Sequence, residues 1–327
     1  MIPLLFRRIP KLAVMVVLPT PPFAETTERI ILLPNTKKKG LKRKGKVFLG
    51  TIFLNGLPPK EMMPKIPTGI ESLDLALGGG IPAGSLILLV GESGAGKSEF
   101  TYTVTANINS MREDPSLLPS GFDVVLPEHV WYATFGRSEE GVLSDVRGKF
   151  SEDFYERFTK GTLFREFFTV PSRLTSFHEW IASVISNGGH IKLRREVFSS
   201  LARFLEREGP GMMVVFHTLT DLSLLFRKGE EMEFVSFLQS LREICREWNV
   251  TVLAILASGI LSADVEALLV SNADGVFSFE IQGEELTRRT LFSCKRMRGA
   301  TISPEPFELT VTPDGVELTR LRTLAGR

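Results

Sequence analysis

The sequence predicts an α/β domain with a mostly parallel sheet flanked by helices and an antiparallel β segment near the C-terminal end. Short apolar runs alternate with segments of helical apolar spacing, a pattern typical of βαβ units. A glycine-rich turn joins the apolar run at 86–90 to a helical segment. Residues 287–320 instead carry strand-like stretches around the turn Pro313-Asp314-Gly315.

The expected elements follow from this alternation in chain order. The segment after the glycine-rich turn continues as a helix over 98–109, and Pro115, Pro119 and Pro127 favour a loop over 113–128. Apolar runs predict strands at 86–90, 130–135, 212–216, 250–256 and 275–279. Helical spacing predicts helices at 138–150, 174–186, 194–207 and 234–248.

The glycine-rich turn matches the G-x-x-x-x-G-K-[ST] pattern of phosphate-binding loops. Glycines let backbone amides turn toward a polyphosphate, and the N-terminus of the following helix attracts anions. The lysine supplies a charge for the β- and γ-phosphates, and Ser98 offers a hydroxyl to Mg²⁺. The predicted nucleotide-binding residues are Gly91, Glu92, Ser93, Gly94, Ala95, Gly96, Lys97 and Ser98.

The stretch just upstream of the loop indicates a family. Residues 66–85 read IPTGIESLDLALGGGIPAGS. The pattern TGI-x-x-LD-x-x-L-GGGIP-x-GS, running into a phosphate loop, resembles the RecA superfamily and most closely its KaiC and RadA-like branch. The resemblance covers about residues 64–320. It implies a RecA-like fold, ATP and Mg²⁺ as cofactors, and a homo-oligomer in the form of a ring or filament.

The resemblance implies an Mg²⁺-binding Asp directly after the strand at 212–216, but His217 stands there. An imidazole is a poor substitute, because Mg²⁺ prefers hard oxygen ligands. Asp221 is the nearest carboxylate in the sequence and the alternative metal ligand. It falls after the strand, so we expect it to point elsewhere unless it has taken over this role.

The resemblance also implies a pair of Glu residues after the second strand, where this chain has Gly136 and Arg137. Neither residue can act as a general base. Glu139 and Glu140 follow and are the candidate catalytic residues, although they also fit the first turn of the next helix. Loss of a general base costs about 10²–10⁴ in rate, so weak or absent hydrolysis is expected.

A third landmark is the basic stretch KRMRGA at 295–300. KaiC-like proteins carry K-x-R-G at a strand end, and this motif reaches the γ-phosphate of the neighbouring subunit. In the frame of this motif the matching residues are Arg296, which stands in place of the Lys, and Arg298. A guanidinium can pair with two phosphate oxygens, so the resemblance implies the same contact here. The alternative is a basic hairpin end that faces solvent.

Charge is divided unevenly along the chain. The net charge is +1, but residues 1–61 carry +9 and residues 62–327 carry −8. We predict a basic N-terminal segment over 1–61, disordered or not natively translated, and a nucleotide-binding domain over 62–327. Seven of the ten residues at 37–46 are cationic, which indicates either a solvated tail or an arm for an anionic partner.

Two further features bear on location. Cys245 and Cys294 lack the spacing of a metal site, which favours a reducing compartment. The apolar run at 12–18 is too short to cross a bilayer. We therefore expect a cytoplasmic protein with no membrane partner.

Three functions remain open on the sequence alone. The leading hypothesis is an ATP-binding RecA/KaiC-like protein with weak or absent hydrolysis and a regulatory or assembly role. The first alternative is an active ATPase whose carboxylates come from Asp221 and from Glu139 or Glu140. The second is a RadA-like DNA-binding recombinase paralogue. The acidic balance of residues 62–327 makes nucleic acid the less favoured partner.

Overall fold

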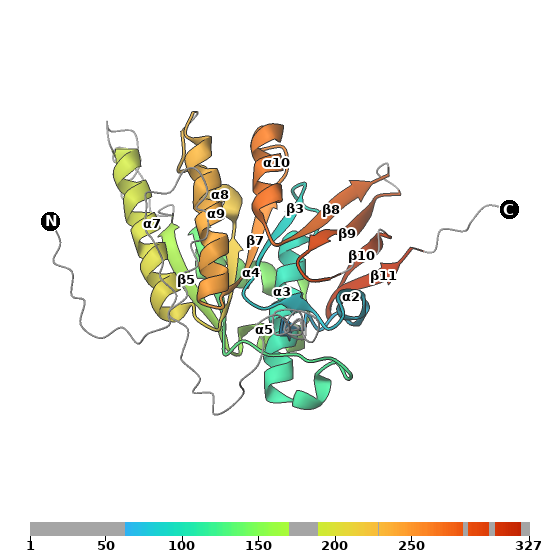
Figure 1. The fold of residues 1–327 in the computed structure, drawn as a ribbon. Coiled ribbons are helices and arrows are strands. Elements are labelled where there is room, and N and C mark those ends of the chain that lie inside the picture. Colours follow the sequence, from blue (N-terminus) through green and yellow to red (C-terminus); the bar gives the residue numbers. More distant parts are fainter. Residues whose placement is uncertain (1–62, 170–188, 228, 284–286, 301–304, 322–327) are drawn as a thin grey trace, which may run out of the picture. The chain divides into compact units, whose positions relative to one another are not determined.

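Figure 1 shows the computed structural model, which describes residues 63–169, 189–227, 229–283, 287–300 and 305–321. The basic segment predicted at 1–61 and the helix predicted at 174–186 lie outside the described residues. The domain boundary near residue 62 therefore stays a prediction.

A sheet of nine strands carries the described part of the chain, in the order β11-β10-β9-β8-β3-β7-β6-β4-β5. The run from β8 to β5 is parallel throughout, whereas β9, β10 and β11 are added antiparallel at one edge. A small antiparallel pair precedes the sheet in the chain. The large sheet comprises β3 (Leu86–Gly91), β4 (Val130–Gly136), β5 (Thr162–Thr169), β6 (Met213–His217), β7 (Thr251–Ala257), β8 (Gly275–Gln282), β9 (Arg289–Met297), β10 (Phe307–Thr312) and β11 (Gly315–Arg320). The small pair is β1 (Lys65–Ile66) and β2 (Ile81–Pro82).

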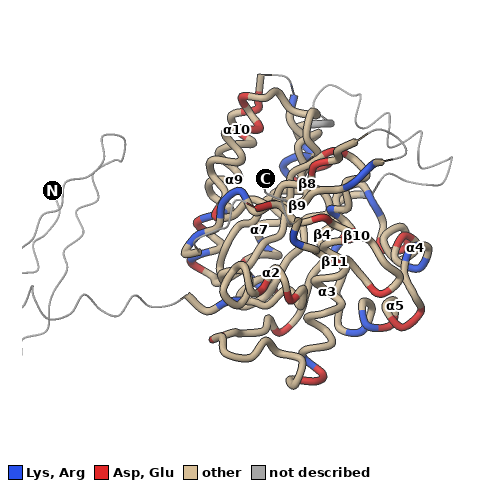
Figure 2. The backbone as a smooth tube through the Cα atoms, turned by 90° about the vertical axis from the view of Figure 1, so that its right-hand side faces the viewer, with Lys and Arg blue, Asp and Glu red and all other residues tan. Residues whose placement is uncertain are grey.

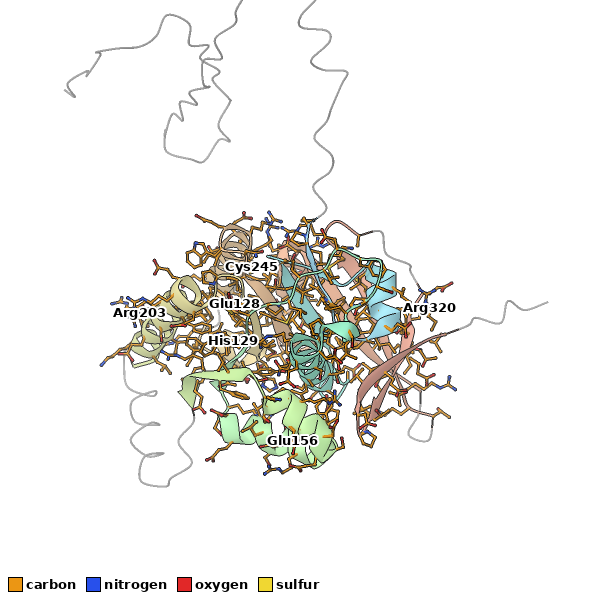
Figure 3. The ribbon with its side chains drawn as sticks, turned by 90° about the horizontal axis from the view of Figure 1, so that it is seen from below. Glu128, His129, Glu156, Arg203, Cys245 and Arg320 are labelled. Atoms are coloured by element: carbon orange, nitrogen blue, oxygen red, sulfur yellow. The ribbon has the colours of Figure 1, made fainter. Side chains whose placement is uncertain are left out.

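Helices pack on both faces of the sheet (Figure 1). One face is covered by α2 (Glu71–Leu77), α3 (Lys97–Glu113), α4 (Glu139–Lys149) and α5 (Glu152–Thr159). The other face is covered by α7 (Gly189–Glu208), α8 (Leu219–Ser223), α9 (Glu231–Glu247) and α10 (Ala263–Asn272). Seen from below, Arg203 of α7 and Glu156 of α5 lie on separate sides of the structure (Figure 3). A 3₁₀ turn, η1 (Pro115–Leu117), follows α3.

The apolar run of β3 is explained by its position between these two layers. Ile87 and Leu89 join the core under α3, whereas Leu86 and Leu88 join the core under α7 and α9. Successive side chains of a strand point to opposite faces, so a strand buried on both faces is apolar throughout. The same alternation in β6 directs Met213 and Val215 toward the α3 face, which predicts that face for His217 as well.

The structure confirms the predicted fold class. Each predicted strand, and each predicted helix within the described residues, has a counterpart whose ends differ by a few residues. The hairpin at the turn Pro313-Asp314-Gly315 is the β10–β11 pair. The sequence analysis missed α5, although Ser151 caps it and Phe154 and Phe158 are buried one turn apart. It also missed β5 and α10.

In the part of the chain that the structure describes, every helix is too short or too polar to cross a bilayer.

Candidate nucleotide-binding site

The predicted phosphate loop connects the end of β3 to the start of α3 (Figure 1). Gly94 and Gly96 have φ angles of 79° and 82°, in the left-handed region that glycine adopts readily. A Cβ on Gly91 would collide with the carbonyl oxygen of Phe279 in β8, so the strand end leaves no room for a side chain. The conformation of the loop thus requires the glycines of the sequence pattern.

Lys97 folds back against the start of the loop. Its Nζ donates hydrogen bonds to the carbonyl oxygens of Gly91, at 2.7 Å, and Glu92, at 2.6 Å. Burial lowers the pKa of this ammonium, and the charges of Glu99 and Glu92 oppose that shift. The Lys97 ammonium group is therefore fixed by backbone hydrogen bonds at the carboxyl end of the central strand β3.

His217 lies next to Ser98, at the position where the family resemblance implied an Asp. The imidazole is buried, and its Nε2 lies 3.3 Å from Ser98 Oγ and 3.4 Å from Tyr102 Oη. The ring also stacks on Tyr102, with centroids 6.0 Å apart. Burial, helped by the nearby charge of Arg137, lowers the pKa of His217 to about 4, so the ring is neutral near pH 7.

Tyr102 is a residue of this site that the sequence analysis missed. It follows Ser98 by four positions in α3, so both side chains lie on the same helix face. That spacing was the available signal. In the adjacent strand β4, Thr134 pairs with His217 in the register, and Thr134 Oγ1 and His217 Nδ1 are both buried without a hydrogen-bond partner among the described residues.

Arg137 follows β4 at the same end of the sheet. Its Nη2 donates to Asp145 Oδ2 at 2.5 Å and to the carbonyl oxygen of Gly141 at 3.2 Å. Its charge lowers the pKa of His217, and it opposes the rise that burial causes in the pKa of Asp221. A guanidinium thus stands where the KaiC-like pattern has a carboxylate.

The predicted catalytic residues Glu139 and Glu140 are exposed in the first turn of α4. Ser138 caps this helix, because its Oγ accepts a hydrogen bond from the amide of Gly141 at 3.2 Å. The amide of Glu139 donates to Glu166 Oε1 at 2.7 Å. These contacts fit the helix-start interpretation, and a catalytic role stays a prediction.

Asp221, the predicted alternative ligand of Mg²⁺, belongs to the start of α8. Its Oδ2 accepts a hydrogen bond from Thr218 Oγ1 at 2.7 Å, and its amide donates to the same hydroxyl at 3.1 Å. Burial raises the pKa of this carboxyl group. The carboxylate therefore serves a capping turn, and metal binding by Asp221 stays a prediction that this geometry does not favour.

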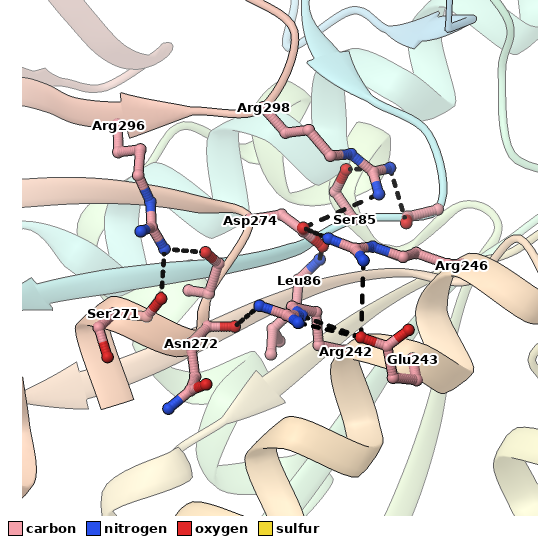
Figure 4. A network of polar contacts seen from close by, with 12 residues as sticks. Ser85, Leu86, Arg242, Glu243, Arg246, Ser271, Asn272, Asp274, Arg296 and Arg298 are labelled. Atoms are coloured by element: carbon pink, nitrogen blue, oxygen red, sulfur yellow. Dashed lines mark hydrogen bonds and ion pairs between the residues drawn. The ribbon is translucent and has the colours of Figure 1, made fainter. Parts of the chain in front are cut away.

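Arg296 and Arg298 lie near the amino end of β3, whereas the phosphate loop lies at its carboxyl end (Figure 4). Arg298 Nη2 donates to Ser85 Oγ and to the carbonyl oxygen of Gly84, both at 3.1 Å. Arg296 Nη2 donates to the carbonyl oxygens of Val270 and Ser271 at 3.0 Å. Both guanidinium groups are thus bound within the chain, and a contact with a neighbour's phosphate stays a prediction.

Comparisons with known proteins agree with these features. A family model described as the KaiC ATPase matches residues 66–115. The DNA repair protein RadA of Halalkalibacterium halodurans is 29% identical over 161 residues, which cover 48% of this chain and 33% of RadA. RecA of Thermus thermophilus is 40% identical over 75 residues, which cover 23% of this chain and 21% of RecA. The chain thus spans about a third or less of these curated relatives.

Among solved structures, a KaiC-like protein from Pyrococcus horikoshii OT3 has the same fold. The TM-score is 0.51 at 17% identity, over 78% of this chain and 99% of that one. The sheet and the phosphate loop define a P-loop α/β domain. The sequence matches to KaiC, RadA and RecA proteins, together with the shared fold, support a RecA-superfamily P-loop ATPase similar to the KaiC and RadA proteins.

ATPases of this kind typically use ATP together with Mg²⁺, and the residues here fit the nucleotide better than the metal. The described residues include no cluster of three or more His, Cys, Asp or Glu side chains able to hold a metal ion. Ser98 Oγ lies against an imidazole, and Asp221 serves the turn at α8. Because Mg²⁺ demands near-octahedral oxygen ligands, this donor set does not fit it.

Proposed function

We propose that the chain binds ATP at residues 91–98, hydrolyses it weakly or not at all, and has a regulatory or assembly role as a homo-oligomer. The observation that supports this most is the contact between His217 and Ser98. It puts a buried imidazole at the strand end where hydrolysing relatives carry an acidic metal ligand. The glycines and Lys97, which carry nucleotide affinity, retain the geometry of a phosphate loop.

The chemistry of the neighbouring positions supports the same proposal. Hydrolysis needs a base that orients and polarises the attacking water. Gly136 has no side chain, and Arg137 is a donor only, since a guanidinium does not lose its proton in proteins. With both carboxylates replaced, we expect turnover to be at least about 100-fold slower than in a P-loop ATPase with an intact base.

The test measures ATP binding and ATP turnover on the same preparation of the full chain. Lys97→Ala should abolish binding, because it removes the cation held at the loop. Lys160→Ala is the matched control, since this exposed lysine pairs with Glu113 at the far end of α3. Binding that depends on Lys97 with negligible turnover supports the proposal. Robust turnover that Lys97→Ala abolishes would instead favour an active ATPase with displaced carboxylates.

A DNA-binding role is the second candidate, and the match to a DNA repair protein over 161 residues favours it. The net charge of −8 over residues 62–327 opposes it. In Figure 2, basic and acidic residues are also interspersed along α4 and α5. Salt-dependent binding of single-stranded DNA by the full chain, compared with a variant whose cations at 37–46 are replaced by Gln, would decide between the two roles.

A further inference from the structure

Within the proposed nucleotide site, the side chains that end the strands beside β3 alter the local charge. In a P-loop site that uses Mg²⁺, carboxylates near the γ-phosphate are balanced by the metal ion. Here β6 ends in His217, and Arg137 follows β4. An imidazole carries no negative charge in either of its protonation states, and a guanidinium is always positive. The acidic group that would help to hold a divalent cation at this position is therefore missing.

The contact geometry points in the same direction. Ser98 Oγ, the hydroxyl that would ligate Mg²⁺, lies 3.3 Å from His217 Nε2. The same nitrogen lies 3.4 Å from Tyr102 Oη. The imidazole is 2% exposed and packed between aromatic rings, so it cannot swing away without opening the core. The hydroxyl that would bind Mg²⁺ is thus in contact with a fixed imidazole that carries no negative charge.

Two cations near His217 and the loop, Lys97 and Arg137, can balance a polyphosphate, although Arg137 already pairs with Asp145 at 2.5 Å and a phosphate would have to share or displace that carboxylate. Lys97 Nζ is held at the start of the loop by two carbonyl oxygens. Arg137 comes three residues after Thr134, which pairs with His217 in the register of β4 and β6. Its guanidinium is therefore anchored just beyond the end of the sheet, where Asp145 and Gly141 hold it. Arginine can bind two phosphate oxygens at once and so supply the neutralisation that a metal ion otherwise supplies.

We propose that this site binds the triphosphate of ATP without Mg²⁺, with Lys97 and Arg137 as the neutralising groups. The inference rests on the proposed function, because it concerns the same site. It predicts a defined signature, namely nucleotide affinity that is insensitive to chelation of divalent cations and sensitive to the charge at residue 137.

The experiment is calorimetric titration of the full chain with ATP, once in excess Mg²⁺ and once in excess EDTA. The two dissociation constants should agree within about threefold. Arg137→Gln should weaken binding about tenfold in both buffers, and Arg137→Lys, which keeps the charge but loses the two-oxygen contact, should weaken it less than Arg137→Gln. Arg157→Ala is the matched control, because Arg157 pairs with Asp153 on the surface of α5. It should leave both constants unchanged.

A second pair of variants tests the role of the imidazole. His217→Asp restores an acidic group beside Ser98 and should make binding at least about tenfold stronger in Mg²⁺ than in EDTA. His217→Asn is similar in shape but neutral and should remain insensitive to the metal. Thermal unfolding of each variant verifies that it is folded, and Asn keeps the comparison valid if buried Asp prevents folding.

The possible outcomes separate the two proposals. Binding by the wild type that is at least about tenfold weaker in EDTA would overturn the metal-independent mode and leave ATP binding standing. Unchanged affinity in Arg137→Gln would also overturn it. Absence of binding in both buffers, the same as in Lys97→Ala, would overturn the proposed function and this inference together.

Discussion

Replacement of Asp274 by Ala should destabilise the domain by about 3 kcal/mol. The Asp274 side chain is 2% exposed and joins three elements at the amino end of β3 (Figure 4). Its Oδ2 accepts a hydrogen bond from the amide of Leu86 at 3.2 Å, and its Oδ1 accepts one from Arg246 Nη2 at 2.6 Å. Arg298 Nη1 lies 3.8 Å from the same Oδ1.

The magnitude follows from what each partner loses. A buried amide without its acceptor costs about 1–3 kcal/mol, and a charge-assisted hydrogen bond contributes about 1.5–3 kcal/mol. The second figure is reduced here, because the Arg246 side chain is 38% exposed and regains water when its partner is removed. The looser pair with Arg298 adds little, so the total is about 3 kcal/mol.

The assay is urea unfolding of the wild type, Asp274→Ala, Arg246→Ala and the double variant. The double-mutant cycle should show coupling of about 1 kcal/mol between the two residues. Glu243→Ala is the control: this carboxylate also pairs with Arg246, but it is 60% exposed and should cost less than about 0.5 kcal/mol. Equal effects of Asp274→Ala and Glu243→Ala would refute the argument from burial.

Three further predictions concern other buried groups. Burial depresses the pKa of His217 to about 4 from 6.5, so the unfolded chain binds more protons between these values. The wild type should therefore lose about 3 kcal/mol of unfolding free energy relative to His217→Gln as the pH falls from about 7 to about 4, and parallel pH profiles would contradict this. Asp74→Ala should cost about 3 kcal/mol in urea unfolding, because the Asp74 carboxylate accepts hydrogen bonds from the amide and hydroxyl of Thr68 and from the amide of Gly69. A loss below about 1 kcal/mol would show that water replaces the carboxylate. Phe100→Ala should cost about 4 kcal/mol and lower the melting temperature more than Phe100→Leu, because the ring is fully buried among three other phenylalanine rings; equal losses would refute the cavity argument.

The fold could be predicted where a short stretch of sequence also indicates how the segment is placed in the sheet. An unbroken apolar run that ends in Gly91 and leads through Gly96 to Lys97 indicates both a buried strand and its functional end. Strand β5 was not predicted, because Arg165 and Glu166 interrupt its apolar pattern. That interruption is tolerated because β5 is the last strand of the sheet and, among the described residues, pairs with β4 alone.

The sequence showed which residue types occupy the candidate site, but it did not show which of these residues are in contact. The absence of an Asp at position 217 is visible in the sequence. The contact of His217 with Ser98 and Tyr102 depends on how β6 and α3 pack, which involves residues more than a hundred positions apart. Likewise, the sequence does not show whether the side chain of Arg137, which follows a strand, faces solvent or contacts another residue. Its bond to Asp145, in the second turn of α4, is what anchors it near the strand ends.

The central place of β3 has a consequence for synthesis of the protein on the ribosome. The register pairs Leu86 with Val252 on one side, and Ile87 with Gly275 on the other. Both neighbours of the strand are therefore translated long after it, and a nascent chain that ends before β7 exposes an apolar strand with two open edges. Such a chain is prone to aggregation, because open strand edges and exposed apolar surface associate with other chains. The start of the phosphate loop attains its packed form only after β8 has emerged, because Gly91 lies against Phe279 of that strand.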